Sequence, residues 1–267
     1  MLQKHAAAQA PADWRLTSKG ADWPGFTAKF DKIETSGTLI LQDANRGGLL
    51  IANGDRAKAG YLPGSTFKIP NTMIALQTGA AKDLDQEIFK YSGRPFLVEG
   101  KPFLPKACEA DINLETAFKN SCVPVYQELA RRIGAEAYKD WLTKFDYGNA
   151  DVGGPLDSFW LDGALRISAI EQVKFLRRLV MKTLGVSPRA NALTEQAMFI
   201  EKIGETSIHG KSGWVYSQSP ATGWWIGFAQ RGEDVVLIAL NMDMPKREHA
   251  EARYRLVKEA LSEAGVV

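Results

Sequence analysis

The chain has 267 residues, of which 45% are hydrophobic and 24% charged, and its 33 basic and 31 acidic side chains leave a net charge of +2. These values fit a folded protein with a substantial core, in one large domain or two interlocked ones. They exclude a nucleic-acid binder that relies on a basic patch, since no basic block stands out. They also exclude a membrane-spanning segment, since the longest apolar candidate, residues 235–240, is only strand-sized.

The N-terminal residues 1–14 are polar and rich in small side chains, as in a flexible tail, and they lack the apolar core of a signal peptide. The first predicted elements are two strands, at 37–43 and 48–53. A turn-like A-N-R-G separates them, so a hairpin is expected.

From residue 65 to about 201 the apolar spacing becomes helical. Gly and Pro mark two long loops in this part, at 92–106 and 147–156. The spacing predicts helices over 72–77, 125–133, 136–145, 170–181 and 194–200.

Beyond residue 204 strand-like segments return at 208–216, 224–230 and 234–243, followed by a helix over 247–263. We therefore predict an α/β fold of the α+β type, with one antiparallel sheet flanked by terminal helices and a separate all-helical lobe. Residues 1–62 and 203–267 together are expected to form the sheet domain. Residues 63–202 would form the helical domain, with the active site in the cleft between them.

Residues 60–71 read G-Y-L-P-G-S-T-F-K-I-P-N, which places Ser65 and Lys68 on one face of a helix. Such a pair can be a nucleophile and its base, or an ordinary polar pair at the start of a helix. Three more short stretches follow, each of which alone could be structural. They are S-C-V at 121–123, Y-G-N at 147–149 and K-S-G at 211–213, and chance explains their joint presence in this order poorly.

Together with F-W-L at 159–161, these motifs resemble the penicillin-recognising serine enzymes, and within them the class D β-lactamases. The resemblance runs from about Gly37 to Ala264. K-S-G replaces the commoner K-T-G and keeps the hydroxyl. The resemblance implies the β-lactamase/transpeptidase-like fold and hydrolysis of small β-lactam antibiotics through an acyl-enzyme on Ser65. It also implies no cofactor or metal, and export to the periplasm, with the leader absent from this chain.

Lys68 is the candidate base, because no histidine carries a triad signature. Apolar walls formed by Phe67, Val123, Trp160 and Leu161 would lower its pKa from an ordinary value of about 10.4. The resemblance further implies that neutral Lys68 reacts with CO2. The resulting carbamate would be the general base for acylation and deacylation, with the Trp160 indole as a hydrogen-bond donor.

The resemblance assigns proton relay toward the leaving nitrogen to Ser121, and a supporting positive charge to Lys211. The backbone N–H groups of Ser65 and Trp214 would form the oxyanion hole. The expected substrate-binding residues are Ser212, Gly213, Trp214, Arg253 and Tyr147.

Within that set, Ser212 and Arg253 would bind the substrate carboxylate, since a guanidinium offers a planar fork. Arg247 and Arg255 compete for this role but are better explained as surface charges. Tyr147 is expected in the cleft wall.

The two cysteines and three histidines show no zinc-type spacing. A disulfide between Cys108 and Cys122 could contribute about 3 kcal/mol. The sequence does not show that the geometry fits, and unpaired thiols are the favoured interpretation. Cys108 falls where some class D members carry a bulky aromatic at the cleft rim, which leaves substrate preference open.

Two alternatives remain. A β-lactam sensor domain of a membrane receptor would carry nearly the same motifs but stay acylated, and a cell-wall D,D-peptidase would use the same nucleophile on peptides. The motifs do not decide between a monomer and a homodimer, nor between penicillins, cephalosporins and carbapenems as substrates.

Overall fold

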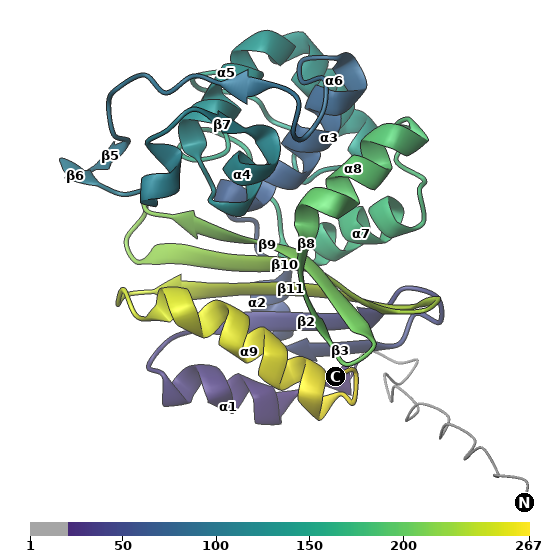
Figure 1. The fold of residues 1–267 in the computed structure, drawn as a ribbon. Helices are drawn as coiled ribbons and strands as arrows, with labels where there is room; N and C mark the ends of the chain where they lie inside the picture. The colour runs from purple at the N-terminus through teal and green to yellow at the C-terminus, as the bar shows by residue number, and fades with distance from the viewer. Residues whose placement is uncertain (1–20) are drawn as a thin grey trace, which may run out of the picture.

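The computed structural model describes residues 21–267, so the expected flexible tail lies outside the described residues. A seven-stranded sheet with the order β1-β3-β2-β11-β10-β9-β8 crosses the middle of the molecule (Figure 1). Only β1 pairs in parallel, with β3, and every other neighbouring pair is antiparallel. The strands of this sheet are β1 (Ala21–Asp22), β2 (Gly37–Asp43), β3 (Leu49–Ala52), β8 (Phe199–Ile203), β9 (Thr206–Val215), β10 (Ala221–Arg231) and β11 (Asp234–Met244).

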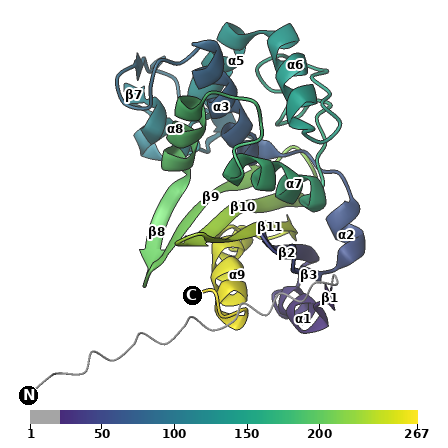
Figure 2. The ribbon, with the colours of Figure 1, turned by 90° about the vertical axis from the view of Figure 1, so that its right-hand side faces the viewer.

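Helices cover both faces of the sheet (Figures 1 and 2). α1 and α9 pack on one face, and α7 packs on the other, where the remaining long helices gather. The helices are α1 (Pro24–Lys32), α2 (Gly54–Lys58), η1 (Gly64–Phe67), α3 (Lys68–Thr78), η2 (Lys106–Cys108), α4 (Leu114–Lys119), α5 (Val123–Ile133), α6 (Ala135–Phe145), α7 (Ala169–Val180), α8 (Pro188–Met198) and α9 (His249–Glu263). Four short strands pair in the helical part, namely β4 (Ile88–Phe89) with β7 (Ile112–Asn113) and β5 (Leu97–Val98) with β6 (Lys101–Pro102).

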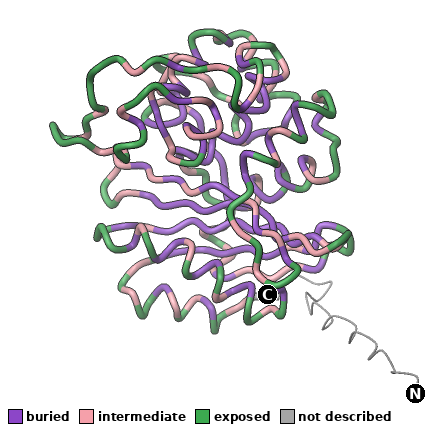
Figure 3. The backbone as a smooth tube through the Cα atoms, viewed as in Figure 1, coloured by how far each residue is buried: buried purple, intermediate pink, exposed green. Residues whose placement is uncertain are grey.

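The central strands are buried on both sides, which Figure 3 shows as continuous purple tubes. In β11, Leu237 and Ala239 join the core beneath the helices, whereas Ile238 and Leu240 join the core beneath α1 and α9. A strand covered on both faces needs apolar side chains at successive positions rather than at alternate ones. This explains the uninterrupted apolar run at 235–240.

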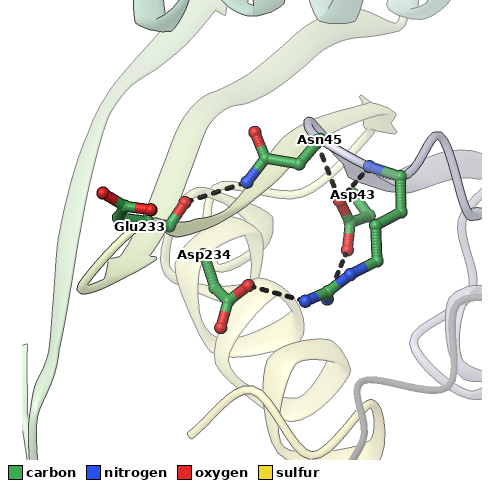
Figure 4. A network of polar contacts seen from close by, with 5 residues as sticks. Asp43, Asn45, Glu233 and Asp234 are labelled. Carbon is green, nitrogen blue, oxygen red and sulfur yellow. Dashed lines mark hydrogen bonds and ion pairs between the residues drawn. The ribbon is translucent and has the colours of Figure 1, made fainter.

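Two neighbouring turns at one end of the sheet are tied together (Figure 4). Asp43 accepts hydrogen bonds from the backbone amides of Asn45 and Arg46 at 2.8 and 2.7 Å, which shapes the turn between β2 and β3. The side-chain amide of Asn45 donates to the backbone carbonyl of Glu233 at 2.9 Å, and the Arg46 guanidinium pairs with Asp234. Because the Arg46–Asp234 ion pair is exposed, the hydrogen bonds of the two turns contribute more to their stability than this ion pair does.

The predicted fold class is confirmed, including the first hairpin and the three strands after residue 204. One helix was misplaced. The helix expected over 194–200 is α8, which begins at Pro188 behind the cap Ser187 and ends at Met198. Phe199 and Ile200 instead open β8, which pairs with β9. β8 is a short edge strand of mixed polarity, so its apolar spacing does not distinguish it from a helix. It crosses the domain boundary expected at residue 202.

Cys108 and Cys122 form a disulfide with a Cα–Cα distance of 5.3 Å, so the favoured interpretation of unpaired thiols is wrong. The bond joins η2 to the residue before α5, two segments whose approach depends on the tertiary fold. Sequence spacing alone could not establish that approach.

Because the disulfide joins residues separated by 14 positions, it should restrict the unfolded chain. We expect the double variant Cys108→Ala/Cys122→Ala to lose about 3 kcal/mol in the free energy of unfolding. Denaturant titration without reductant measures this loss. With reductant present, wild type and variant should converge, and equal stability without reductant would contradict the assignment.

Candidate active site

Ser65 and Lys68 lie at the junction of η1 and α3, where Lys68 is the first residue of the longer helix. The Lys68 Nζ donates a hydrogen bond to the Ser65 Oγ at 3.1 Å. Ser65 is 9% exposed and lines a cavity, whereas Lys68 is fully buried behind it. The hydroxyl can therefore be reached from the cavity while the amine is shielded from water.

Two glycines let strand β9 approach the Ser65 turn closely. Gly64 has φ +54°, and a Cβ there would lie 3.2 Å from the carbonyl oxygen of Trp214. A Cβ on Gly213 would lie 3.0 Å from the carbonyl oxygen of Pro63. The backbones of Trp214 and Ser65 therefore lie close together, and both residues line the cavity.

Lys68 has no compensating charge. Its Nζ lies 4.8 Å from the centre of the Tyr126 ring, and no carboxylate in residues 21–267 forms an ion pair with it. Burial, aided by the nearby charge of Lys211, holds the pKa of Lys68 well below its ordinary value. A buried amine of this kind favours the uncharged form, as required of a base.

Trp160 lies beside the segment that carries Ser65. Its ring stacks on Phe67 with centroids 5.4 Å apart, and its carbonyl accepts a hydrogen bond from the Gly64 amide at 3.0 Å. The indole Nε1 is buried and finds no acceptor among the described residues. Since a buried donor without a partner is costly, this atom marks a place where a hydrogen-bond acceptor would be stabilising.

Ser121 and Lys211 form a second hydroxyl–amine pair. Ser121 sits in the turn between α4 and α5 with φ +58°, and its Oγ accepts a hydrogen bond from the Lys211 Nζ. The same Nζ donates to the Ser212 carbonyl at 3.0 Å. Burial, with a further contribution from the charge of Arg253, lowers the pKa of Lys211 to about 7. Lys211 can therefore gain or lose a proton near neutral pH.

Arg253 on α9 borders the same cavity as Ser212. Its guanidinium donates to the Gly213 carbonyl and its Nε donates to the Ala250 carbonyl at 2.9 Å. Burial lowers the pKa of Arg253 to about 10, so it stays charged at neutral pH. Arg247 also lines the cavity, whereas Arg255 pairs with Glu259 at 2.7 Å.

The cavity has a volume of about 300 Å³ and brings most predicted site residues together. It also has an aromatic rim that the motifs did not reveal. Phe103 lies with its ring centroid 5.3 Å from Trp214 and 4.9 Å from Tyr216. The predicted residues in its lining are Ser65, Ser121, Val123, Leu161, Ser212, Gly213, Trp214 and Arg253.

Lys211 and Arg253 are buried without an ion-pair partner in the described part of the chain. Buried cations are ordinarily paired, because an isolated charge in a poorly solvated place is costly. This arrangement suits an anionic ligand.

Residues 37–262 match the family model of the penicillin binding protein transpeptidase domain. The fold is similar to FUS-1 (OXA-85), a class D β-lactamase from Fusobacterium nucleatum subsp. polymorphum, with a TM-score of 0.86 and 30% identity over 92% of this chain and 100% of that one. It is also similar to the class D β-lactamase YbXI from Nostoc, with a TM-score of 0.84 and 32% identity over 91% of this chain and 99% of that one. The chain belongs to the class D family of serine β-lactamases.

Curated relatives of this class D β-lactamase agree with this family assignment. It is 40% identical to β-lactamase OXA-48 of Klebsiella pneumoniae over 242 residues, which span 91% of this chain and 88% of the relative. It is 35% identical to β-lactamase OXA-5 of Pseudomonas aeruginosa over 245 residues, which span 91% of this chain and 89% of the relative. The family resemblance noted from the motifs is thereby confirmed.

Two residues of this class D β-lactamase lie elsewhere than expected. Tyr147 does not line the cavity, because its ring is fully buried 5.9 Å from Phe67 and 5.1 Å from Phe175, where it supports Phe67 from behind. Cys108 is absent from the cavity rim, because its disulfide draws it toward α5. Within residues 21–267, none of the helices has both the length and the apolar character needed to cross a bilayer.

Proposed function

We propose that the protein hydrolyses β-lactam antibiotics through an acyl-enzyme on Ser65, with Lys68 as the base. The observation that carries this proposal is the 3.1 Å hydrogen bond between the Ser65 Oγ and the fully buried Lys68 Nζ, which forms no ion pair within residues 21–267. The β-lactamase names of the relatives support the same reaction class.

In acylation, the Ser65 hydroxyl gives its proton to the base at position 68, and the Oγ attacks the β-lactam carbonyl carbon. The carbonyl oxygen becomes an oxyanion, for which the adjacent backbone N–H groups of Ser65 and Trp214 are the proposed donors. Preorganised donors of this kind typically lower the activation barrier by about 3–4 kcal/mol.

A carbamate on Lys68 fits this pocket. Its formation joins the neutral amine to CO2 with loss of a proton, and burial keeps the amine neutral. The buried Trp160 Nε1 offers a free donor for an anionic oxygen. Carboxylated Lys68 would supply an oxygen base that takes the Ser65 proton in acylation and the proton of a water in deacylation.

The pair Ser121–Lys211 is proposed to return a proton to the β-lactam nitrogen as the C–N bond breaks. A pKa of about 7 suits Lys211 for this transfer, because it can hold or release a proton at neutral pH. Ser212 and Arg253 are proposed to bind the substrate carboxylate, with Arg253 supplying the permanent charge.

We also propose that the protein works in an oxidising compartment such as the bacterial periplasm. The Cys108–Cys122 disulfide supports this location, because such bonds persist outside the reducing cytosol.

Mixing the protein with a chromogenic cephalosporin should give many product molecules per Ser65. The proposal requires deacylation as well as acylation, so the progress curve should continue far past one equivalent. A single stoichiometric burst would instead indicate a sensor domain, and cleavage of a D-alanyl-D-alanine peptide without β-lactam turnover would indicate a D,D-peptidase.

A further inference from the structure

A second hollow lies beside the active-site cavity, at the edge of strand β9. β8 pairs with β9 only as far as His209, which faces Phe199, so β9 has no strand partner on that side from Gly210 onward. A hollow of about 540 Å³ occupies this edge, between the start of β8, the end of α4 and the first turns of α9.

The two hollows share three lining residues, Lys119, Ser212 and Arg253, whereas Ser65 lines only the first. The proposed carboxylate-binding pair therefore lies between the nucleophile and the second hollow. A β-lactam with its carbonyl at Ser65 and its carboxylate at Arg253 would hold a group attached beside that carboxylate next to the wall that the two hollows share.

Several aromatic and aliphatic side chains line one part of the second hollow. Trp225 forms its floor, so close to the strand that a Cβ on Gly210 would lie 2.4 Å from the indole, and Tyr254 stacks on Trp225 at 5.3 Å. Phe199 and Ile200 form one side and are 43% and 41% exposed. Large apolar side chains exposed together beside a cleft are a common feature of binding surfaces.

The basic side chains around this hollow are already engaged, and the one acidic side chain among the described residues of its lining is Glu251 on α9. Lys119 pairs with Glu115 at 2.7 Å, Lys211 donates to Ser121, and Arg253 donates to the Gly213 carbonyl. An anionic substituent would therefore find no free cation among these described lining residues and would meet Glu251, whereas the aromatic walls offer contact area to an uncharged aromatic group.

We propose that the second hollow binds an uncharged aromatic substituent carried next to the carboxylate-bearing carbon of a cephalosporin, a subsite that deepens and rests on the proposed β-lactam hydrolysis. In cephalosporins the ring carbon next to the carboxylate-bearing carbon carries a variable group, whereas in penicillins that neighbouring carbon carries only two methyl groups. The hollow thus favours cephalosporins with a large group at this position in the acylation step.

The test uses two cephalosporins with the same acylamino group, one with a methyl and one with a styryl group at that carbon. The styryl group does not leave during hydrolysis, so kcat/KM reports binding in the acylation step. In Phe199→Ser/Ile200→Ser the styryl-to-methyl ratio of kcat/KM should fall about five-fold, the scale of a partly lost apolar contact.

A matched control removes two exposed apolar side chains that line neither hollow. Ile88→Ser/Met181→Ser should keep the wild-type ratio. A second variant, Ala250→Phe, fills the hollow and should lower kcat/KM for the styryl substrate more than for the methyl one. An unchanged ratio in both hollow variants overturns the subsite. Hydrolysis of the methyl cephalosporin by wild type reports separately on the proposed function.

Discussion

Ser65→Ala should lose β-lactam hydrolysis by on the order of 10⁴-fold or more, because it removes the proposed site of the acyl-enzyme. Intact-mass measurement after exposure to a penicillin should show an adduct on wild type and none on the variant. Ser65 is nearly buried and the substitution removes one oxygen atom, so the fold should persist.

Ser262→Ala is the matched control, because Ser262 is exposed on α9 and far along the chain from every motif. It should keep wild-type turnover and the adduct. An adduct on Ser65→Ala would place the nucleophile elsewhere and contradict the mechanism.

Lys68→Arg should lower kcat/KM by about 10²–10⁴-fold, the usual contribution of a general base. A guanidinium stays protonated, so it can neither accept the Ser65 proton nor react with CO2. Since a buried arginine could disturb folding, Lys68→Met provides an uncharged variant of similar length. Both should lose activity while circular dichroism shows a folded chain.

The control for this position is Lys58→Arg, since Lys58 is an exposed lysine on α2. It should behave as wild type. Undiminished hydrolysis by Lys68→Arg or Lys68→Met would contradict the assignment of the base.

The apolar period of the sequence allowed the fold class to be predicted, and the resemblance of its motifs to class D β-lactamases supplied the predicted part of the cavity lining. Ser65 and Lys68 are one helical turn apart, and Ser212 and Gly213 follow Lys211 on one strand. The apolar period likewise located the sheet strands that are covered on both faces.

Features that depend on tertiary approach could not be predicted in this way. The Cys108–Cys122 bond requires η2 to meet the start of α5, and Phe103 reaches Trp214 from a loop without any motif. The family resemblance implies Tyr147 in the cleft wall, but the fold turns its ring into the core.

The central claim is that buried Lys68 is kept neutral, reacts with CO2 and then acts as the base. Protonation below its lowered pKa removes the neutral amine, so mild acid in CO2-free buffer should abolish the activity. Trp160→Phe removes the unpaired donor and should require more bicarbonate for the same activity.

The most direct measurement is hydrolysis of one penicillin, from about pH 5 to about pH 8, with and without added bicarbonate. The account predicts that activity falls toward acid, returns on addition of bicarbonate in wild type, and returns less readily in Trp160→Phe. Activity that is independent of bicarbonate across this range would contradict it.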